Sequence, residues 1–579
     1  METMITKCLA AACAVLLCIA EAYPQIRLPP TTFNGNTKAA YDNNNQGCAM
    51  LEKSNWDAAI AHFKRALELD PRLVVAHANC ASAYYSKGDY NNAIRYYNSA
   101  LEIDPKLAPA HNGRGYAMLE KGDLDGALAD FNLAIELDPQ SAAAYNGRGH
   151  TKQNKGDSNG ALADFNRTLE LSPKYTAAYN GRGNAKRNKG DLDGALADFN
   201  LAIELNPKFA AAYTNRGHVK QDRNSLNAAL ADYNRAIELN PMFAAAYNGR
   251  GNAKWAKGDL DGALADFNLA VKSDPNYASA YGNRGNAKWA KGDLDGALAD
   301  FNLAIELNPK SAAAYNSRGN TKWAKGDAGG ALADFSHALE LDPTLTSAYI
   351  NRGSIFSHKG DYGSAIRDYS AALKLNPKLP SSYGNRGNAY SYKGDYNKAI
   401  QDYNSALELD PKLASAYNGR GTAKWAKGDA TNALADFNHA LELDPTLASA
   451  YSNRASASSH RGDYDRALQD YSRAIELDPK LISAYQGRAT TCFNKGEIGK
   501  ARADVKKCLE LGARVDSDFL TKLEKASAIE QASPKKLASP EEPSTQKPQP
   551  SPKKQAPAKK QVPPKQLIFP IEPNFYKEK

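Results

Sequence analysis

Proline recurs every 34 residues from Pro71 to Pro479, thirteen times and without a single insertion or deletion. A fixed period of this length means that one supersecondary unit has been copied and stacked along the chain. When each unit is numbered so that its proline is position 32, fourteen units run from residue 40 to about residue 513. Each unit in such an array contacts only its neighbours, so we expect a core that forms a long stripe.

The residues inside each unit predict two antiparallel helices. Alanine fills position 20 in all fourteen units, and an aromatic residue fills position 24 in every unit but the last, which has Val505. Gly-Asp or Gly-Glu occupies positions 15 and 16 in twelve units, where glycine can end the first helix and the acid can cap the second. Ser54-Asn55 and Asn224-Ser225 replace that pair in the other two units, and these residues also form turns.

This pattern, with tyrosine at position 4 from Tyr145 onward and glycine or alanine at position 8, resembles the tetratricopeptide repeat (TPR) family over about four-fifths of the chain. The resemblance implies an all-α, right-handed superhelical solenoid of about 14 helix-turn-helix repeats with a concave binding groove. After the last repeat, Val515 to about Ala528 has an amphipathic pattern. A solenoid needs its open end covered, so we expect residues 514–530 to form a capping helix.

The two ends of the chain differ in character from the repeats. Residues 1–22 have the pattern of a signal peptide: Lys7, an apolar run, and the small-x-small site Ala20-Glu21-Ala22. Residues 23–39 form a lead-in to the repeats at 40–513, and residues 531–579 hold eleven prolines and ten lysines, which predicts a disordered, basic tail.

The tail ends in an apolar-aromatic motif, Leu567 to Ile571, which either docks on another surface or has no role. Its two Ser-Pro-Lys-Lys tetrapeptides resemble minor-groove DNA-binding motifs, but an exported protein would not meet DNA, so no nucleic-acid partner is expected. Lysines in this pattern favour contact with anionic polymers or an envelope surface. We expect a periplasmic or extracellular protein with no transmembrane helix after cleavage of the signal peptide.

Four cysteines lie outside the predicted signal peptide, at Cys48, Cys80, Cys492 and Cys508. Export would permit disulfides. Because free cysteine also packs as a small apolar residue, pairing of Cys48 with Cys80 or of Cys492 with Cys508 stays open. The chain has no CxxC motif or ligand cluster, and we expect no metal or other cofactor.

Arginine at position 7 and aspartate at position 23 appear together in repeats 3 to 14 and are both missing from repeats 1 and 2. This co-occurrence predicts an ion pair between the two helices of each repeat, and an arginine row for acidic ligands is the alternative. The representative pairs are Arg250 with Asp266 and Arg284 with Asp300.

Positions 5, 9 and 12 share one face of the first helix, the face that lines the concave groove in the TPR family. Asparagine is frequent at positions 5 and 9, where its amide could bind the backbone of an extended ligand. The candidate residues are Asn112, Asn146, Asn180, Asn184, Asn248, Asn252, Asn286, Asn316, Asn320, Asn388 and Asn418. The alternative is a hydrophilic inner face with no ligand.

Tryptophan occupies position 12 in four repeats, at Trp255, Trp289, Trp323 and Trp425. Stacked indoles would form an apolar strip of the kind that often marks a binding site. Residues 251–270 and 285–304 are identical, so duplication could also have copied a tryptophan that only packs.

Three functions fit these features. The first is a non-catalytic protein–protein interaction scaffold that binds extended peptide segments in the groove. The second is a cell-envelope organiser that binds glycan or an anionic polymer through the tryptophan strip and the tail. The third is the TPR arm of a glycosyltransferase-type system, but no part of the chain outside the repeats could fold into a catalytic domain, so we expect no enzyme activity. Members of the family that hold chaperone C-termini use lysine at position 5, which is absent here.

Overall fold

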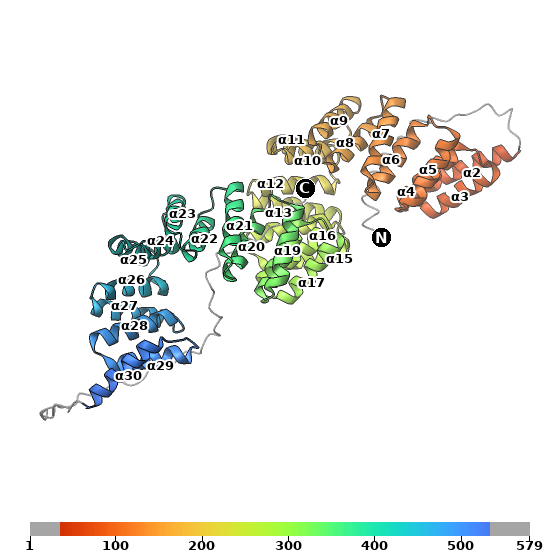
Figure 1. Ribbon diagram of the computed structural model, residues 1–579. Helices are drawn as coiled ribbons and strands as arrows, with labels where there is room; N and C mark the ends of the chain where they lie inside the picture. Colours follow the sequence, from red (N-terminus) through yellow and green to blue (C-terminus); the bar gives the residue numbers. More distant parts are fainter. Residues whose placement is uncertain (1–34, 533–579) are drawn as a thin grey trace, which may run out of the picture. The chain divides into compact units, whose positions relative to one another are not determined.

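The computed structural model describes residues 35–532, and this part of the chain consists of helices and short turns with no strand. The predicted signal peptide, most of the lead-in and the tail lie outside the described residues. The chain divides after Pro309 into two compact units, each described by itself below. Within each unit, successive helices pack side by side as hairpins (Figure 1). The predicted all-α fold of stacked helix pairs is confirmed.

Unit 1 holds repeats 1 to 8, in which each repeat contributes a first and a second helix. Their bounds are α2 (Gly35–Glu52), α3 (Trp56–Leu69), α4 (Val74–Lys87), α5 (Tyr90–Ile103), α6 (Ala108–Lys121), α7 (Leu124–Leu137), α8 (Ala142–Asn154), α9 (Ser158–Leu171), α10 (Thr176–Asn188), α11 (Leu192–Leu205), α12 (Ala210–Asp222), α13 (Leu226–Leu239), α14 (Ala244–Ala256), α15 (Leu260–Ser273), α16 (Ala278–Ala290) and α17 (Leu294–Leu307).

Unit 2 holds repeats 9 to 14 and one additional helix. The bounds are α18 (Ala312–Ala324), α19 (Ala328–Leu341), α20 (Thr346–His358), α21 (Tyr362–Leu375), α22 (Pro380–Tyr392), α23 (Tyr396–Leu409), α24 (Ala414–Ala426), α25 (Ala430–Leu443), α26 (Ala448–His460), α27 (Tyr464–Leu477), α28 (Ile482–Lys495), α29 (Ile498–Glu510) and α30 (Ser517–Ala532).

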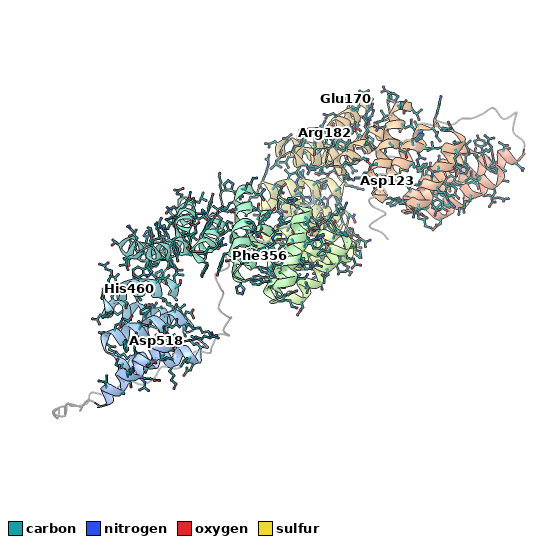
Figure 2. The ribbon with its side chains drawn as sticks, viewed as in Figure 1. Asp123, Glu170, Arg182, Phe356, His460 and Asp518 are labelled. Atoms are coloured by element: carbon teal, nitrogen blue, oxygen red, sulfur yellow. The ribbon has the colours of Figure 1, made fainter. Side chains whose placement is uncertain are left out.

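The turn between the two helices of a repeat follows the sequence prediction. Glycine at position 15 adopts a left-handed backbone with φ between 80° and 86° in twelve repeats, and Ser54 and Asn224 take the same region with φ of 56° and 58°. The next residue caps the second helix: Asp123, labelled in Figure 2, accepts a hydrogen bond from the Gly126 amide at 3.0 Å. Glu497 is an exception, because its longer side chain makes no cap bond to α29.

Two boundaries differ from the predicted ones. The first helix begins at Gly35 and not at residue 40, so the end of the predicted lead-in is already helical. The last helix covers Ser517–Ala532, a few residues later than the predicted 514–530. Such shifts of a few residues are common at helix ends, where capping and tertiary contacts decide the boundary.

The core is a row of aromatic rings set between small residues. The position-24 ring is fully or almost fully buried in repeats 1 to 13, and Phe267 is 0% exposed. Glycine at position 8 leaves room for this ring, since a Cβ on Gly251 would lie 2.6 Å from Phe267 Cε1. The alanines at position 20 are all 0% exposed and let the helices approach closely. Each repeat therefore buries one large ring against its own small residues and those of the next repeat.

Helix α30 covers the end of unit 2, as predicted. Leu523 is 3% exposed and packs in the last apolar cluster with partly buried Phe519 and Leu520. Phe519 meets Phe493 of α28 edge to face, with ring centroids 5.5 Å apart. Without α30, the apolar side of the last repeat would be in contact with water.

Candidate functional site

The twelve arginines at position 7 all lie against the aspartate at position 23 of their own repeat. Arg250 donates from Nη2 to Asp266 Oδ1 at 2.6 Å and from Nε to Oδ2 at 2.9 Å, and Arg284 binds Asp300 in the same way at 2.6 and 2.8 Å. The Asp266 side chain is 2% exposed and that of Arg250 is 20% exposed. The hydrogen bonds that Arg250 donates to the Asp266 carboxylate raise the pKa of Arg250. These arginines join the helices of a repeat, so they do not form a row that is free to bind acidic ligands.

The structure adds two partners that the sequence analysis missed. Lysine at position 11 is a second cation on the same aspartate in seven repeats, as with Lys254 at 2.8 Å from Asp266. The third guanidinium nitrogen reaches position 25 of the preceding repeat, as in the 2.8 Å bond from Arg250 Nη1 to Asn234 Oδ1. The 34-residue alignment contained this signal, because asparagine or serine stands at position 25 wherever the bond forms. The network therefore links neighbouring repeats as well as the helices within one repeat.

The asparagines at positions 5 and 9 are less accessible than predicted. Six of them are buried: Asn112, Asn146, Asn248, Asn286, Asn316 and Asn320. Four are half-buried (Asn180, Asn184, Asn252 and Asn418) and one, Asn388, is exposed. The prediction of a continuous ladder of eleven ligand-binding amides is therefore wrong for the six buried asparagines. Only the other five remain candidates for contact with a ligand.

Four asparagines at position 5 are hydrogen-bonded to the next repeat; two of them are buried (Asn248 and Asn316) and two are half-buried (Asn180 and Asn418). Asparagine at position 6 of the next repeat donates to the position-5 amide oxygen, as from Asn283 to Asn248 at 2.9 Å and from Asn453 to Asn418 at 2.9 Å. The same bond joins Asn351 to Asn316 at 3.2 Å and Asn215 to Asn180 at 2.9 Å. Two asparagines 35 residues apart were the available sequence signal, and they link successive first helices.

The four position-12 tryptophans are all half-buried. Trp255 packs against the cluster of Ala263, Phe267 and Ala287 in unit 1. In unit 2, Trp323 meets His358 edge to face at 5.2 Å between ring centroids, and Trp425 meets His460 at 5.3 Å. Part of each indole thus packs on its own repeat or on the next one, while the remainder lies at the surface.

Two histidines stand at position 9, where other repeats have asparagine, and both are largely buried. His150 packs edge to face on Phe165 with ring centroids 5.0 Å apart, and His218 packs in the same manner on Tyr233 at 5.5 Å. Burial lowers the pKa of His150 to about 4 and that of His218 to about 3. The folded protein therefore holds both imidazoles neutral at physiological pH.

We expect His150 to make unit 1 sensitive to acid. In the unfolded chain a histidine binds a proton near pH 6.5, whereas folded His150 resists protonation down to about pH 4. Its contribution to stability is therefore complete above pH 6.5 and is lost as pH falls toward 4, by on the order of 2–3 kcal/mol. His150→Asn should reduce the acid sensitivity of repeat 4 in a urea titration at pH 7, 5.5 and 4. His218→Asn should act likewise in repeat 6, and equal slopes in wild type and both variants would contradict this.

The four described cysteines are free in the structure. Cys80, Cys492 and Cys508 are buried and Cys48 is half-buried. Burial raises the pKa of Cys48 to about 11 and that of Cys80 to about 12, so both thiols stay protonated and are poor nucleophiles. This fits the prediction that they pack as small apolar residues.

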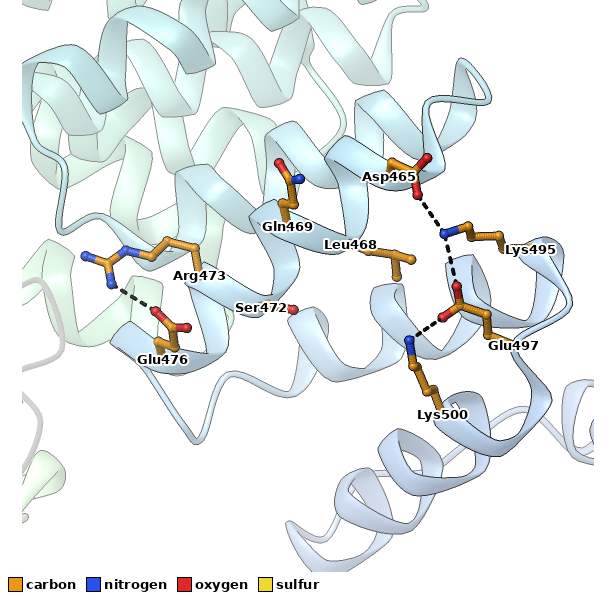
Figure 3. A pocket seen from close by; sticks show the side chains of 9 residues that line it. All are labelled: Asp465, Leu468, Gln469, Ser472, Arg473, Glu476, Lys495, Glu497 and Lys500. Carbon is orange, nitrogen blue, oxygen red and sulfur yellow. Dashed lines mark hydrogen bonds and ion pairs between the residues drawn. The ribbon is translucent and has the colours of Figure 1, made fainter. Parts of the chain in front are cut away.

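A shallow depression of about 550 Å³ lies near the end of unit 2 (Figure 3). Lys495 lies between Asp465 at 2.6 Å and Glu497 at 3.0 Å, and Lys500 also contacts Glu497 at 2.9 Å. The charged side chains that line this depression thus pair with one another. Within residues 35–532, no group of histidine, cysteine and acidic side chains is placed to hold a metal ion. In the same range, no helix combines the length and apolar character needed to span a bilayer.

The chain matches models of two kinds of tetratricopeptide motif. The TPR repeat model matches residues 47–88, 81–122, 115–156, 183–222, 217–258, 251–292, 285–326, 353–392 and 387–428. Tetratricopeptide repeat models also match residues 448–481 and residues 142–175, 312–345 and 414–447. No curated protein matches the chain.

One solved structure shows the same fold at low sequence identity, and others are similar to parts of the chain. The crystal structure of the APC/C hetero-tetramer Cut9–Hcn1 is 16% identical, with a TM-score of 0.51, and the match covers 88% of this chain and 98% of that one. A tetratricopeptide repeat protein from Parabacteroides merdae is 22% identical over 43% of this chain and 98% of its own, with a TM-score of 0.38. PilF from Pseudomonas aeruginosa is 18% identical over 37% and 97%, with a TM-score of 0.33.

Proposed function

This chain belongs to the tetratricopeptide repeat family, and we propose that it is a non-catalytic scaffold that binds extended segments of partner proteins along its first helices. Solenoids of this kind serve in general as protein–protein interaction scaffolds, because stacked repeats offer a long, regular surface. The observation that carries the proposal is the recurrence of accessible polar groups at one helical position: Asn184, Asn252 and Asn388 all stand at position 9 with part of the side chain at the surface.

An asparagine amide both donates and accepts hydrogen bonds, so it can pair with the peptide groups of any extended segment. The Asn388 oxygen already accepts from Tyr403 at 2.6 Å and the Asn252 oxygen is buried, so these two residues would bind a segment by donating from their NH2 groups. The exposed part of each position-12 indole lies about one helical turn from position 9 on the same face, and it would contact the side chains of that segment. The asparagine pairs between position 5 and position 6 of the next repeat link successive first helices and would keep these contacts at a regular spacing.

The binding proposal is tested by titrating an array of extended peptides of mixed sequence. Peptides that bind should lose about tenfold in affinity when Asn184 and Asn388 are both changed to alanine, and they should also weaken when their backbone amides are N-methylated. Glu238→Ala is the control, because it removes an exposed side chain from a second helix. Binding that is indifferent to both the asparagine changes and N-methylation would contradict the proposal.

A cell-envelope role remains the second candidate, and the half-exposed indoles of Trp323 and Trp425 favour it. Aromatic faces also bind sugar rings, so peptidoglycan fragments should be titrated in parallel while tryptophan fluorescence is followed. Quenching by glycan alone would select this function, whereas quenching by peptide alone would exclude it.

We also propose export of the protein, on the pattern of residues 1–22. N-terminal sequencing of the protein secreted by an expressing bacterium should then begin at Tyr23. A mature protein that keeps Met1 would contradict export by cleavage.

A further inference from the structure

A depression of about 310 Å³ opens between α22 and α23 in repeat 11. It is lined by Tyr383, Arg386, Tyr390, Lys398, Gln401, Asp402 and Ser405. These residues stand at positions 4, 7 and 11 of the first helix and on the adjoining face of the second. Positions 4, 7 and 11 lie about a third of a turn around the helix from positions 5, 9 and 12. The depression is therefore separate from the peptide-binding face proposed above.

Repeat 11 departs from the commonest repeat pattern at two positions that line this depression, and repeats 2 and 10 also lack the usual residues at both positions. Seven repeats have lysine at position 11, and its ammonium crosses this space to reach the position-23 aspartate, as Lys424 reaches Asp436 at 2.7 Å in repeat 12. Repeat 11 has Tyr390 at that position. Position 26 holds a long side chain in most repeats, for example Leu269 or Arg235, but a small one, Ser405, in repeat 11. Without the long side chains, the surface between the helices stays open.

The lining of the depression is mostly polar, with two tyrosine rings, Tyr383 and Tyr390, and one exposed lysine, Lys398, at its edge. The Tyr383 ring lies 5.5 Å from the Arg386 guanidinium, which binds Asp402 at 2.7 and 2.8 Å and so has its charge neutralised. Lys398 lies 5.4 Å from the Tyr390 ring centroid, and its side chain is 60% exposed. Its ion pair with Asp395, at 2.9 Å, is exposed and therefore weak, so the ammonium can exchange to another carboxylate.

Tyrosine walls beside one available ammonium favour a proline-containing segment that carries a carboxylate. Aromatic grooves take proline rings from preformed polyproline II helices at low entropic cost. After Ala532 the sequence has two segments in which prolines flank glutamate, Pro540-Glu541-Glu542-Pro543 and Pro570-Ile571-Glu572-Pro573.

Reach along the chain distinguishes these two segments. Three repeats and α30 separate the depression from Ala532, so at one helix diameter of about 10 Å each the distance along the stack is about 40 Å. Eight residues separate Pro540 from Ala532 and span at most about 28 Å, whereas the 38 residues to Pro570 span up to about 125 Å. Only the second segment reaches.

We propose that residues 570–573 of the tail dock in this depression of the same chain, with the proline rings on Tyr383 and Tyr390 and the Glu572 carboxylate on Lys398. The adjacent apolar residues, Leu567 to Phe569, would then lie along the second helices of neighbouring repeats. Position 30 of these helices bears exposed leucines such as Leu375 and Leu409, 42% and 43% exposed. The depression is thus a docking site for the chain's own C-terminal segment.

The test places a photo-crosslinking phenylalanine analogue at Phe569 of the full chain and maps the crosslinks by mass spectrometry. Crosslinks should fall within residues 362–413, which hold α21 and repeat 11, and should decrease about tenfold with Tyr390→Lys, which introduces the residue found in seven other repeats. Phe356→Lys, the same change at position 11 of repeat 10, is the matched control and should leave the yield unchanged. Crosslinks spread over all repeats would overturn the proposal.

A charge-swap experiment distinguishes loss of the proposed contact from misfolding of a variant. Glu572→Lys changes only the tail and should lower the yield, as should Lys398→Glu, while the two together should restore it. If the double variant does not recover the crosslink yield, the contact between Glu572 and Lys398 is wrong. Mixing isotopically heavy and light chains identifies the origin of the tail: light–heavy crosslinks would show that it comes from a second copy, against docking within one chain.

Discussion

Asp266→Ala should destabilise the repeats around it by about 3–5 kcal/mol. The Asp266 carboxylate is 2% exposed and accepts two hydrogen bonds from Arg250, at 2.6 and 2.9 Å, and one ion pair from Lys254, at 2.8 Å. Alanine would leave the half-buried guanidinium without its carboxylate, and an uncompensated charge is costly away from water. Because stability in such arrays is a sum of local terms, native-state hydrogen exchange should show the loss in α14 and α15 before distant helices.

The double variant Asp266→Ala with Arg250→Leu should be more stable than Asp266→Ala alone. Removing both charged partners leaves no uncompensated guanidinium, and the leucine can pack against Tyr247, on whose ring Arg250 now lies at 5.5 Å. Glu238→Ala is the control for an exposed pair, since Arg235 and Glu238 are 49% and 64% exposed and should contribute less than about 1 kcal/mol. Equal thermal shifts in the single and double variants would refute the pairing.

The repeat register made most of the fold predictable. Proline at position 32, glycine at position 15 and an acid at position 16 mark where each helix stops and starts, and their reasons are local: φ restriction, a left-handed backbone and a cap. The predicted start of the first helix, residue 40, was wrong, and the helix begins at Gly35. No proline or capping residue of the repeat pattern precedes this helix to mark its start. Local signals determine boundaries well only where the chain carries them.

The site was less predictable, because side-chain accessibility depends on the neighbouring repeat. Asn248 and Asn418 have the same residue type and position, yet Asn248 is buried and Asn418 is half-buried. Both accept a hydrogen bond of 2.9 Å from the first helix that follows, so residue type, position and this bond together do not determine the exposed fraction. The depression at Tyr390 was missed for a related reason: Tyr390 and Ser405 lie on different helices and line one space only after the two helices pack together.

Phe267→Ala is the second substitution with a large expected effect, about 3–5 kcal/mol. Phe267 is 0% exposed and forms one buried cluster with Ala263 of its own helix and Ala287 of the next repeat. Truncation would leave a cavity that the helices can close only in part, so the junction between repeats 7 and 8 loses both burial and contact. Urea denaturation should measure the loss, and hydrogen exchange should confine it to α14–α17. Leu269→Ala, in the same helix but 39% exposed, should change stability by no more than about 1 kcal/mol.

A coupling experiment at Gly251 tests whether the ring and the glycine fill one space. A Cβ on Gly251 would lie 2.6 Å from Phe267 Cε1, so Gly251→Leu alone overfills the site and should cost about 1–3 kcal/mol. In combination with Phe267→Ala, the leucine can occupy the cavity, and the double variant should lose clearly less than the sum of the two single losses. Strict additivity would show that the two residues do not share a space. In that case the glycine at position 8 would not be needed to make room for the ring. The packing of one ring between small residues would then not explain how each repeat contacts the next.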